Sequence, residues 1–443
     1  MRRSAPAVLL LILATPALRP AVADDLPRAR PAEVGLDADR LAKATALFRD
    51  AADRKEIAGA VLLVSRRGKV AYLEAVGKRN IEAGDVMTPE SIFRIASMTK
   101  PITSTAAMIL VDEGRLELSD PIAKYLPEFK YMTVAHPRPK DAVAASAGSS
   151  AGEYEQVQAY RPITVRDLLT HTSGLCYRFT DRPHVGRLYA ESGICDGLTP
   201  SEFTMAENVR RLAGLPLHHQ PGTAWEYGLN TDVLGRMVEV VSGQSLDAFI
   251  RARILEPLKM RETTFLLPKS RVDRLAALYE PGPDGKIKRT PDGTSVKGAL
   301  IYSADAAYRQ RPGYFSGGAG LLSTAGDYAR FLQMLLNRGE LDGTRILKAE
   351  TVDAMTRPQT GPLPLWITVH GNTFGYGFGV VTRPDDPKGD PIGAFSWGGI
   401  YYTDFWVDPK DELIGIMMTQ VYPSGNLKLR DEFHRIVNAS IRN

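Results

Sequence analysis

The first 120 residues contain three patterns of apolar positions. Apolar residues recur every three or four positions from 37 to 58, which predicts an amphipathic helix with Asp37 as its N-cap. Two β-rich runs follow at 60–65 and 70–76, and the charged, glycine-containing turn between them predicts a hairpin. A further apolar run, from Ile102 to Val111, predicts a buried helix.

The middle of the chain has a different pattern, with short helices, long loops and many prolines. Apolar runs of the β type return after residue 376, and a helical run closes the chain. β-rich ends around a helical middle predict an α/β fold of the α+β type, with one antiparallel sheet built from both chain ends and flanked by helices. The predicted division is residues 1–23 as a signal peptide, 24–118 as the first part of the α/β domain, 119–311 as an inserted, mainly helical domain, and 312–443 as the second part of the α/β domain.

The N-terminus predicts export. A basic start is followed by an apolar run over 5–18 and by Ala21-Val22-Ala23, which has the small-x-small form of a cleavage site. These features predict a secretory signal peptide cleaved after Ala23 and a periplasmic or secreted protein; an uncleaved anchor is the alternative. Because the apolar run is short for a bilayer, we expect no stable membrane span after signal removal.

Charge narrows the possible partners. Residues 1–23 hold three arginines and no acid, so the mature chain has 52 basic and 51 acidic residues. This near-neutral chain has no basic stripe interleaved with aromatic residues, and we therefore expect no nucleic-acid partner.

The two cysteines, Cys176 and Cys195, leave two alternatives. In an exported protein an even pair is compatible with a disulfide, which would contribute about 3 kcal/mol in the chain-entropy model. Two partly buried thiols are the other alternative. Two cysteines do not form a zinc motif, and we expect no metal.

Candidate chemistry centres on Ser97-Met98-Thr99-Lys100, a Ser-x-x-Lys motif. A spacing of three on a helix puts the Ser97 hydroxyl and the Lys100 amine on the same face. A serine hydroxyl becomes an effective nucleophile when a neighbouring group removes its proton. Pro101 is tolerated only in the first turn of a helix, so the helix should begin near Ser97 and place this residue at the positive end of the dipole.

Tyr227 is the candidate partner for proton transfer. It lies in a loop that enters a helical run, about 130 residues after Ser97. A lysine cation within a few Å favours the phenolate, so a Tyr–Lys pair could act as general base and then as general acid. A packed aromatic residue is the alternative role for any of the 17 tyrosines.

An oxyanion hole needs two backbone N–H groups aimed at the oxygen that becomes charged. The N–H of Ser97 at its helix start is one natural donor. The segment Ser396-Trp397-Gly398-Gly399-Ile400 offers a second, because its glycines allow close backbone approach. A bulge in an ordinary strand is the alternative for this segment.

Five motifs occur in a fixed order. They are Ser97-Met98-Thr99-Lys100, Leu168-Leu169-Thr170-His171-Thr172-Ser173-Gly174-Leu175, Pro221-Gly222-Thr223 with Tyr227, Gly317-Gly318-Ala319-Gly320-Leu321, and Trp397-Gly398-Gly399. With this set, nearly the whole mature chain resembles a family VIII carboxylesterase, the esterase group related to class C β-lactamases and penicillin-binding proteins. The resemblance implies a β-lactamase/transpeptidase-like fold and a serine hydrolase that acts on small carboxylic esters without a cofactor.

The resemblance also implies a role for each matching residue. Ser97 would be the acylated nucleophile, and Lys100 and Tyr227 would form the proton-transfer pair. The N–H groups of Ser97 and Ile400 would form the oxyanion hole. The substrate pocket would include Trp397, Gly398 and Gly399.

Two departures from the β-lactam-active relatives favour neutral esters. Those relatives usually have Tyr-x-Asn, whereas Leu229 stands two residues after Tyr227. They also carry Lys-Thr-Gly where this chain has Trp397-Gly398-Gly399. A lysine there would bind a carboxylate, whereas a tryptophan offers an apolar wall. Slow hydrolysis of β-lactams stays compatible with these changes.

Other nucleophile and metal sites have weaker support. Gly148-Ser149-Ser150-Ala151-Gly152 fits the Gly-x-Ser-x-Gly elbow of α/β-hydrolases, but no strand signal precedes Ser150. His171, in a Thr-Ser-Gly turn, is expected to be a structural hydrogen-bonding residue. The adjacent His218 and His219 would point in opposite directions in a strand, which disfavours a metal site.

The alternatives to an esterase are a β-lactamase or peptidoglycan-directed peptidase of the same fold, an acyltransferase, and a non-catalytic binding module. The export signal motivates the peptidase. An acyl-enzyme that passes its acyl group to an alcohol would make the chain a transferase. A binding module is disfavoured because Ser97, Lys100 and Tyr227 are all present.

Overall fold

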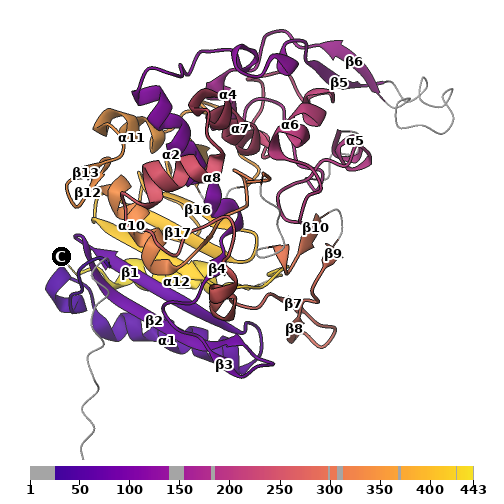
Figure 1. Ribbon diagram of the computed structural model, residues 1–443. Helices are drawn as coiled ribbons and strands as arrows, with labels where there is room; N and C mark the ends of the chain where they lie inside the picture. The colour runs from indigo at the N-terminus through magenta and orange to yellow at the C-terminus, as the bar shows by residue number, and fades with distance from the viewer. Residues whose placement is uncertain are drawn as a thin grey trace, which may run out of the picture.

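A computed structural model describes residues 25–138, 154–180, 185–297, 300–306, 313–367, 371–425 and 427–442. Both ends of the chain contribute to one antiparallel sheet (Figure 1), whose strands run in the order β14-β15-β16-β17-β18-β1-β2-β3. The strands are β1 (Gly59–Arg66), β2 (Lys69–Asn80), β3 (Asp85–Val86), β14 (Thr373–Phe374), β15 (Gly379–Val380), β16 (Phe395–Gly399), β17 (Thr403–Asp408) and β18 (Leu413–Met418).

The N-terminal strand β1 lies in the interior of the sheet, between β2 and the C-terminal strand β18. The register joins Val61 to Met418 and Arg66 to Leu413. Every residue of β1 is buried, which explains its continuous apolar sequence. The predicted antiparallel sheet from both chain ends is thus confirmed.

Each face of the sheet has its own hydrophobic core. Leu62 and Val64 pack with the helices α1 (Ala38–Asp53) and α12 (Leu429–Ser440). The alternate residues Val61 and Leu63 face the larger core, to which α2 (Thr99–Asp112) and α10 (Ala325–Leu336) contribute. Because side chains of a strand alternate between faces, β1 holds the two layers together.

Capping residues mark the ends of several helices, including the predicted N-cap Asp37. Asp37 accepts hydrogen bonds from the N–H groups of Asp39 and Arg40 and caps α1. Thr324 caps α10 in the same way, through the N–H of Asp327. Gly243, with a φ of 75°, ends α7 (Asn230–Ser242) in the left-handed conformation that glycine favours.

The helices α4, α6 and α7 gather at the end of the molecule away from α1 and α12 (Figure 1). The remaining helices are α4 (Val165–Leu169), α5 (Val185–Glu191), α6 (Met205–Ala213), α8 (Leu246–Ile250) and α11 (Ala349–Met355). Short 3₁₀ helices occupy Pro31–Val34, Ala96–Met98, Ile122–Lys124, Pro127–Phe129 and Lys269–Arg274, and a π-helical turn occupies Arg251–Leu255. Short ladders pair β4 (Phe93–Arg94) with β11 (Leu322–Ser323), β5 (Thr133–Pro137) with β6 (Tyr154–Gln158), β7 (Tyr279–Pro281) with β8 (Ile287–Arg289), β9 (Thr294–Lys297) with β10 (Leu300–Ser303), and β12 (Glu340–Leu341) with β13 (Thr344–Arg345). Boundaries of the inserted domain stay a prediction.

Among the described residues, no helix is long and apolar enough to cross a membrane. The predicted signal peptide lies outside the described residues.

The cysteines do not form the disulfide that was one of the two alternatives. Cys176 and Cys195 are both buried thiols. The Cys195 sulfur lies 3.6 Å from the Thr199 hydroxyl and 3.8 Å from the Thr199 carbonyl oxygen, so polar neighbours within its own loop surround it. An even number of cysteines allows a disulfide, but the distance and direction of the side chains decide whether it forms.

A buried ion cluster joins α12 to the sheet. The Nδ1 atom of His434 lies 2.9 Å from both carboxylate oxygens of Asp390, and its Nε2 atom lies 2.8 Å from Asp404. Each ring nitrogen thus faces a carboxylate, an arrangement that suits an imidazole whose two nitrogens both donate. Lys388 approaches Asp390 to 3.2 Å, and the Trp406 indole stacks on His434 with 3.7 Å between centroids.

This cluster makes stability depend on pH. Burial alone would raise the pKa of Asp390, but the charge and hydrogen bond of His434 and the charge of Lys388 hold that pKa below its ordinary value. The stabilisation from Asp390 is therefore present above the unfolded-state pKa of about 4. It is lost as the pH falls from there through the lower folded-state value.

We expect His434→Ala to reduce the free energy of unfolding by about 3–5 kcal/mol, because it leaves two buried carboxylates without their shared cation. Urea-induced unfolding at pH 7 measures this loss. His136→Ala is the matched control, since His136 and its neighbour Glu155 are 64% and 54% exposed; its effect should stay within about 0.5 kcal/mol. Similar losses in both variants would contradict the role of the cluster.

Candidate active site

Ser97 lies in a single 3₁₀ turn, Ala96–Met98, directly before α2. The preceding residue, Ala96, has a φ of +41°, in a region that residues with a side chain rarely adopt. Pro101 falls in the first turn of α2, as predicted from its missing N–H. Strained backbone of this kind persists only when the surrounding structure holds it.

Three separate elements hold the turn that carries Ser97. The Tyr328 hydroxyl of α10 donates to the Met98 carbonyl at 2.8 Å. The N–H of Leu321 donates to the Thr99 hydroxyl at 3.0 Å. On the third side, a Cβ added to Gly399 of β16 would lie 2.4 Å from the Ile95 carbonyl oxygen. Only a glycine therefore allows β16 to approach the serine this closely.

Lys100 is almost completely buried, with 1% of its surface exposed. Its Nζ atom donates to the Ser97 hydroxyl at 3.1 Å and to the Gly318 carbonyl at 2.8 Å. The same nitrogen lies 4.6 Å from the ring centroid of Tyr227 and 5.3 Å from that of Tyr177. The ammonium thus joins the nucleophile, the glycine turn and two aromatic faces.

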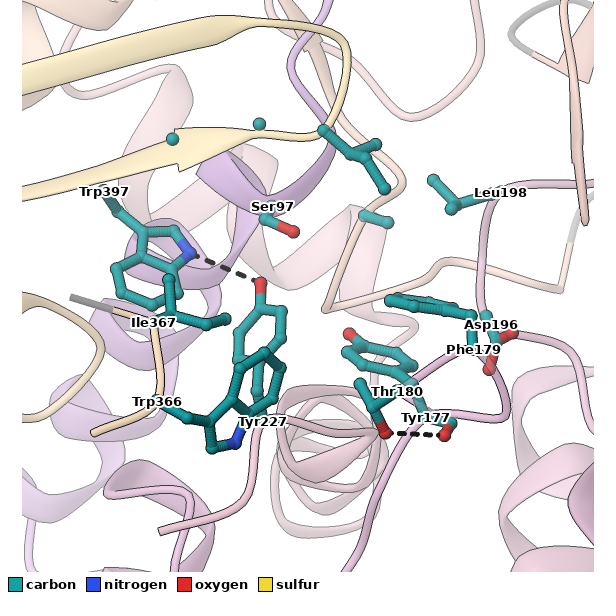
Figure 2. Close-up of a pocket in the computed structure, with 14 residues that line it drawn as sticks. Ser97, Tyr177, Phe179, Thr180, Asp196, Leu198, Tyr227, Trp366, Ile367 and Trp397 are labelled. Atoms are coloured by element: carbon teal, nitrogen blue, oxygen red, sulfur yellow. Dashed lines mark hydrogen bonds between the residues drawn. The ribbon is translucent and has the colours of Figure 1, made fainter. Parts of the chain in front are cut away.

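The Tyr227 ring extends toward Ser97, with its hydroxyl at the end that faces the serine (Figure 2). The indole Nε1–H of Trp397 donates to the Tyr227 hydroxyl at 3.3 Å. Trp225 stacks on the Tyr227 ring at 6.0 Å, and His171 packs against it at 5.1 Å. The structure therefore brings Ser97, Lys100 and Tyr227 together. Trp397, expected to be only an apolar wall, also supplies a hydrogen-bond donor.

The cavity in front of Ser97 has a volume of about 650 Å³ and a mainly apolar lining. Its lining residues are Ser97, Tyr177, Phe179, Thr180, Asp196, Leu198, Tyr227, Ala319, Trp366, Ile367, Trp397, Gly398, Gly399 and Ile400. Trp397, Gly398, Gly399 and Ile400 thus line the same cavity as Ser97. The roles of the Ser97 and Ile400 N–H groups as oxyanion donors stay a prediction.

Three aromatic residues of this cavity were not predicted from the sequence. Tyr177 and Phe179 stack with 4.7 Å between centroids, and Trp366 packs against Tyr227 at 6.5 Å. Burial raises the pKa of Tyr177, and its neighbours Tyr227 and Asp232 raise it further, so this phenol stays protonated. All three lie in irregular segments, where no periodicity distinguishes a pocket residue from a packed one.

His171 is a structural residue, as expected. It is buried, and its Nδ1 atom lies 3.0 Å from the side-chain amide of Asn230. Burial, together with the charge of Lys100, lowers the pKa of His171 well below its ordinary value and keeps the ring neutral. The competing candidate Ser150 lies outside the described residues.

Comparisons with known proteins agree with this geometry. The family model Beta-lactamase matches residues 44–439. Esterase EstB of Burkholderia gladioli is 35% identical over 407 residues, which cover 89% of this chain and 94% of EstB. Protein Rv1367c of Mycobacterium tuberculosis is 35% identical over 392 residues, which cover 85% of this chain and 89% of that protein.

A solved structure shares the fold. EstCE1, described as a hydrolase with promiscuous acyltransferase activity, superposes with a TM-score of 0.74 at 28% identity. The match covers 90% of this chain and 98% of EstCE1. This chain belongs to the Beta-lactamase family. Over nearly its full length it is similar to the esterase EstB and to the hydrolase EstCE1.

We expect Trp397→Phe to slow the labelling of Ser97 by a fluorophosphonate about tenfold and to move its pH dependence to higher pH. A hydrogen bond donated to an oxygen favours the deprotonated form of that oxygen. Loss of the Trp397 indole N–H should therefore make removal of the proton from the catalytic site require a higher pH. Labelling rates between pH 5 and 10, followed by intact mass, measure both effects.

Trp225→Phe is the matched control. It removes an indole that stacks on the same ring but has no hydrogen bond to the Tyr227 hydroxyl. Equal pH shifts in the two variants would show that aromatic packing, rather than the indole N–H, is responsible.

Proposed function

We propose that this protein is a carboxylesterase that hydrolyses small carboxylic esters through an acyl-enzyme on Ser97. The observation that carries this proposal is the 3.1 Å contact between the Lys100 ammonium and the Ser97 hydroxyl, at the wall of an apolar cavity of about 650 Å³. Nucleophilic catalysis by serine needs an activating partner within hydrogen-bond reach and a site that excludes bulk water.

In the proposed reaction, the Ser97 oxygen attacks the ester carbonyl, and its proton passes to the Tyr227–Lys100 pair. The N–H groups of Ser97 and Ile400 bind the oxyanion of the tetrahedral intermediate. Collapse of the intermediate breaks the bond to the alcohol, which leaves with the proton held by the pair. Water then attacks the acyl-enzyme with the same pair as base, and Ser97 recovers its proton.

The lining of the cavity supports neutral substrates. Trp397 lines the cavity. By the resemblance to the β-lactam-active relatives, it would stand where they carry the lysine of Lys-Thr-Gly, and it would bring an indole in place of a cation that binds a carboxylate. β-Lactams, which carry that carboxylate, should therefore be poor substrates. Acyl transfer is a second candidate, because EstCE1 is a hydrolase with promiscuous acyltransferase activity and an apolar cavity also suits an acceptor alcohol.

Three substitutions test the proposed mechanism. Ser97→Ala, Lys100→Ala and Tyr227→Phe should each lower kcat for short-chain p-nitrophenyl esters by about 10²–10⁴-fold, because each removes the nucleophile or its proton carrier. A series of acyl chain lengths, with nitrocefin beside it, defines the substrate class. Ser150→Ala is the control and should keep wild-type turnover. Nitrocefin turnover equal to ester turnover would favour the β-lactamase or peptidase alternative.

We also propose that the protein is exported. The basic start, the apolar run over 5–18 and Ala21-Val22-Ala23 support a signal peptide. Expression with the native N-terminus, followed by fractionation and N-terminal sequencing, should give a mature chain that begins at Asp24 outside the cytoplasm. An intact Met1 on the extracellular or membrane fraction would indicate an uncleaved anchor.

A further inference from the structure

The buried ammonium of Lys100 has no carboxylate in direct contact among the described residues. Its hydrogen-bond partners are a hydroxyl and a peptide carbonyl, both neutral. An ammonium removed from water without a compensating charge tends to lose its proton. A negative charge nearby is therefore needed if Lys100 is to stay a cation beside Ser97.

A source of that charge is Asp232 on α7, five residues after Tyr227. Asp232 is 1% exposed and interacts electrostatically with Lys100. Its Oδ1 atom accepts a hydrogen bond from the Ser316 hydroxyl at 2.6 Å and one from the Gly318 N–H at 3.3 Å. The carboxylate and the ammonium thus bind opposite polar groups of one residue, Gly318.

The backbone at Gly318 fits closely between these groups. A Cβ added to Gly318 would lie 2.5 Å from the Asp232 Oδ2 atom and 3.0 Å from the Tyr177 hydroxyl oxygen. A glycine at this position therefore lets the carboxylate approach the turn. The Gly318 N–H points to Asp232 while its carbonyl points to Lys100, so one residue links the carboxylate to the ammonium.

We propose that Asp232 is a positioning residue whose charge keeps Lys100 protonated and whose hydrogen bonds hold the Gly318 carbonyl against the Lys100 ammonium. This inference rests on the proposed function, since it assigns a role within the same proton-transfer site. Asp232 does not touch the reacting serine; it acts through Gly318 and Lys100.

Three groups around Asp232 favour its charged form, namely the Ser316 hydroxyl, the Lys100 ammonium and the Gly318 N–H. They act against burial, which is the largest influence and raises the pKa of Asp232 above its ordinary value. The other titratable groups that face it are Tyr177, Tyr314 and Asp196. Burial raises the pKa of both phenols, so they stay protonated. Burial also raises the pKa of Asp196 to about 6, although Asp196 pairs with Arg178 at 2.5 Å.

Asp232→Asn tests the role of the charge, because asparagine keeps an oxygen that accepts the two hydrogen bonds. Without the negative charge, the protonated Tyr227–Lys100 pair is less stable. The acid limb of the kcat/KM profile should then move to lower pH by about one unit. The value of kcat/KM on the plateau of this profile should fall roughly tenfold, because a weaker base accepts the Ser97 proton less well. KM should change little. Trp397→Phe should shift the same limb in the opposite direction.

Asp408→Asn is the matched control. Asp408 is also 1% exposed and accepts hydrogen bonds from two backbone N–H groups, at 2.9 and 3.3 Å, in the turn after β17. Its substitution should leave the pH profile unchanged. An unchanged profile for Asp232→Asn, or a uniform loss of kcat/KM with no movement of the acid limb, would overturn the inference.

Ser316→Ala provides a second test if Asp232→Asn does not fold. It keeps the charge and removes the 2.6 Å hydrogen bond, so kcat should fall about fivefold while the acid limb stays in place. Wild-type kcat in this variant would contradict the positioning role. Turnover of the wild type and of Ser97→Ala, measured beside these variants, distinguishes a failure of the proposed function from a failure of this inference. A wild type without esterase activity contradicts the proposed function, whereas an active wild type with unaffected Asp232 and Ser316 variants contradicts only this inference.

Discussion

The buried ammonium of Lys100 is the interaction around which the site is built. It contacts the Ser97 hydroxyl, the Gly318 carbonyl and the faces of two tyrosine rings, and each comes from a different segment of the chain. A buried cation is stable only if its surroundings are fixed and polar groups meet it. This constraint accounts for the glycines, the strained turn before Ser97 and the close approach of β16, because each brings backbone to within contact of the same few atoms.

Much of this arrangement could be predicted from short stretches of sequence. The spacing of Ser97 and Lys100 and the position of Pro101 fixed the start of a helix, and Asp37 and Gly243 marked helix ends through capping chemistry. Such signals act within a few residues. They therefore survive without knowledge of the rest of the fold.

Other features depend on contacts between distant segments. Of the first β-type run expected after residue 376, only Gly379–Val380 forms a strand, because only these residues pair with β16. The pocket wall of Tyr177 and Trp366 comes from irregular segments whose path is set by tertiary packing. The donor role of Trp397 depends on the direction of its indole, which residue type alone does not specify.

The order of strands in the sheet has a consequence for biosynthesis. The pairing of Val61 with Met418 joins positions more than 350 residues apart, and β18 separates the N-terminal hairpin from β17. The ribosome must synthesise the chain as far as β18 before the interior of the sheet can close, and such long-range topology folds slowly. A prematurely terminated chain would lack an interior strand and leave the edge of β1 open to pairing with other chains.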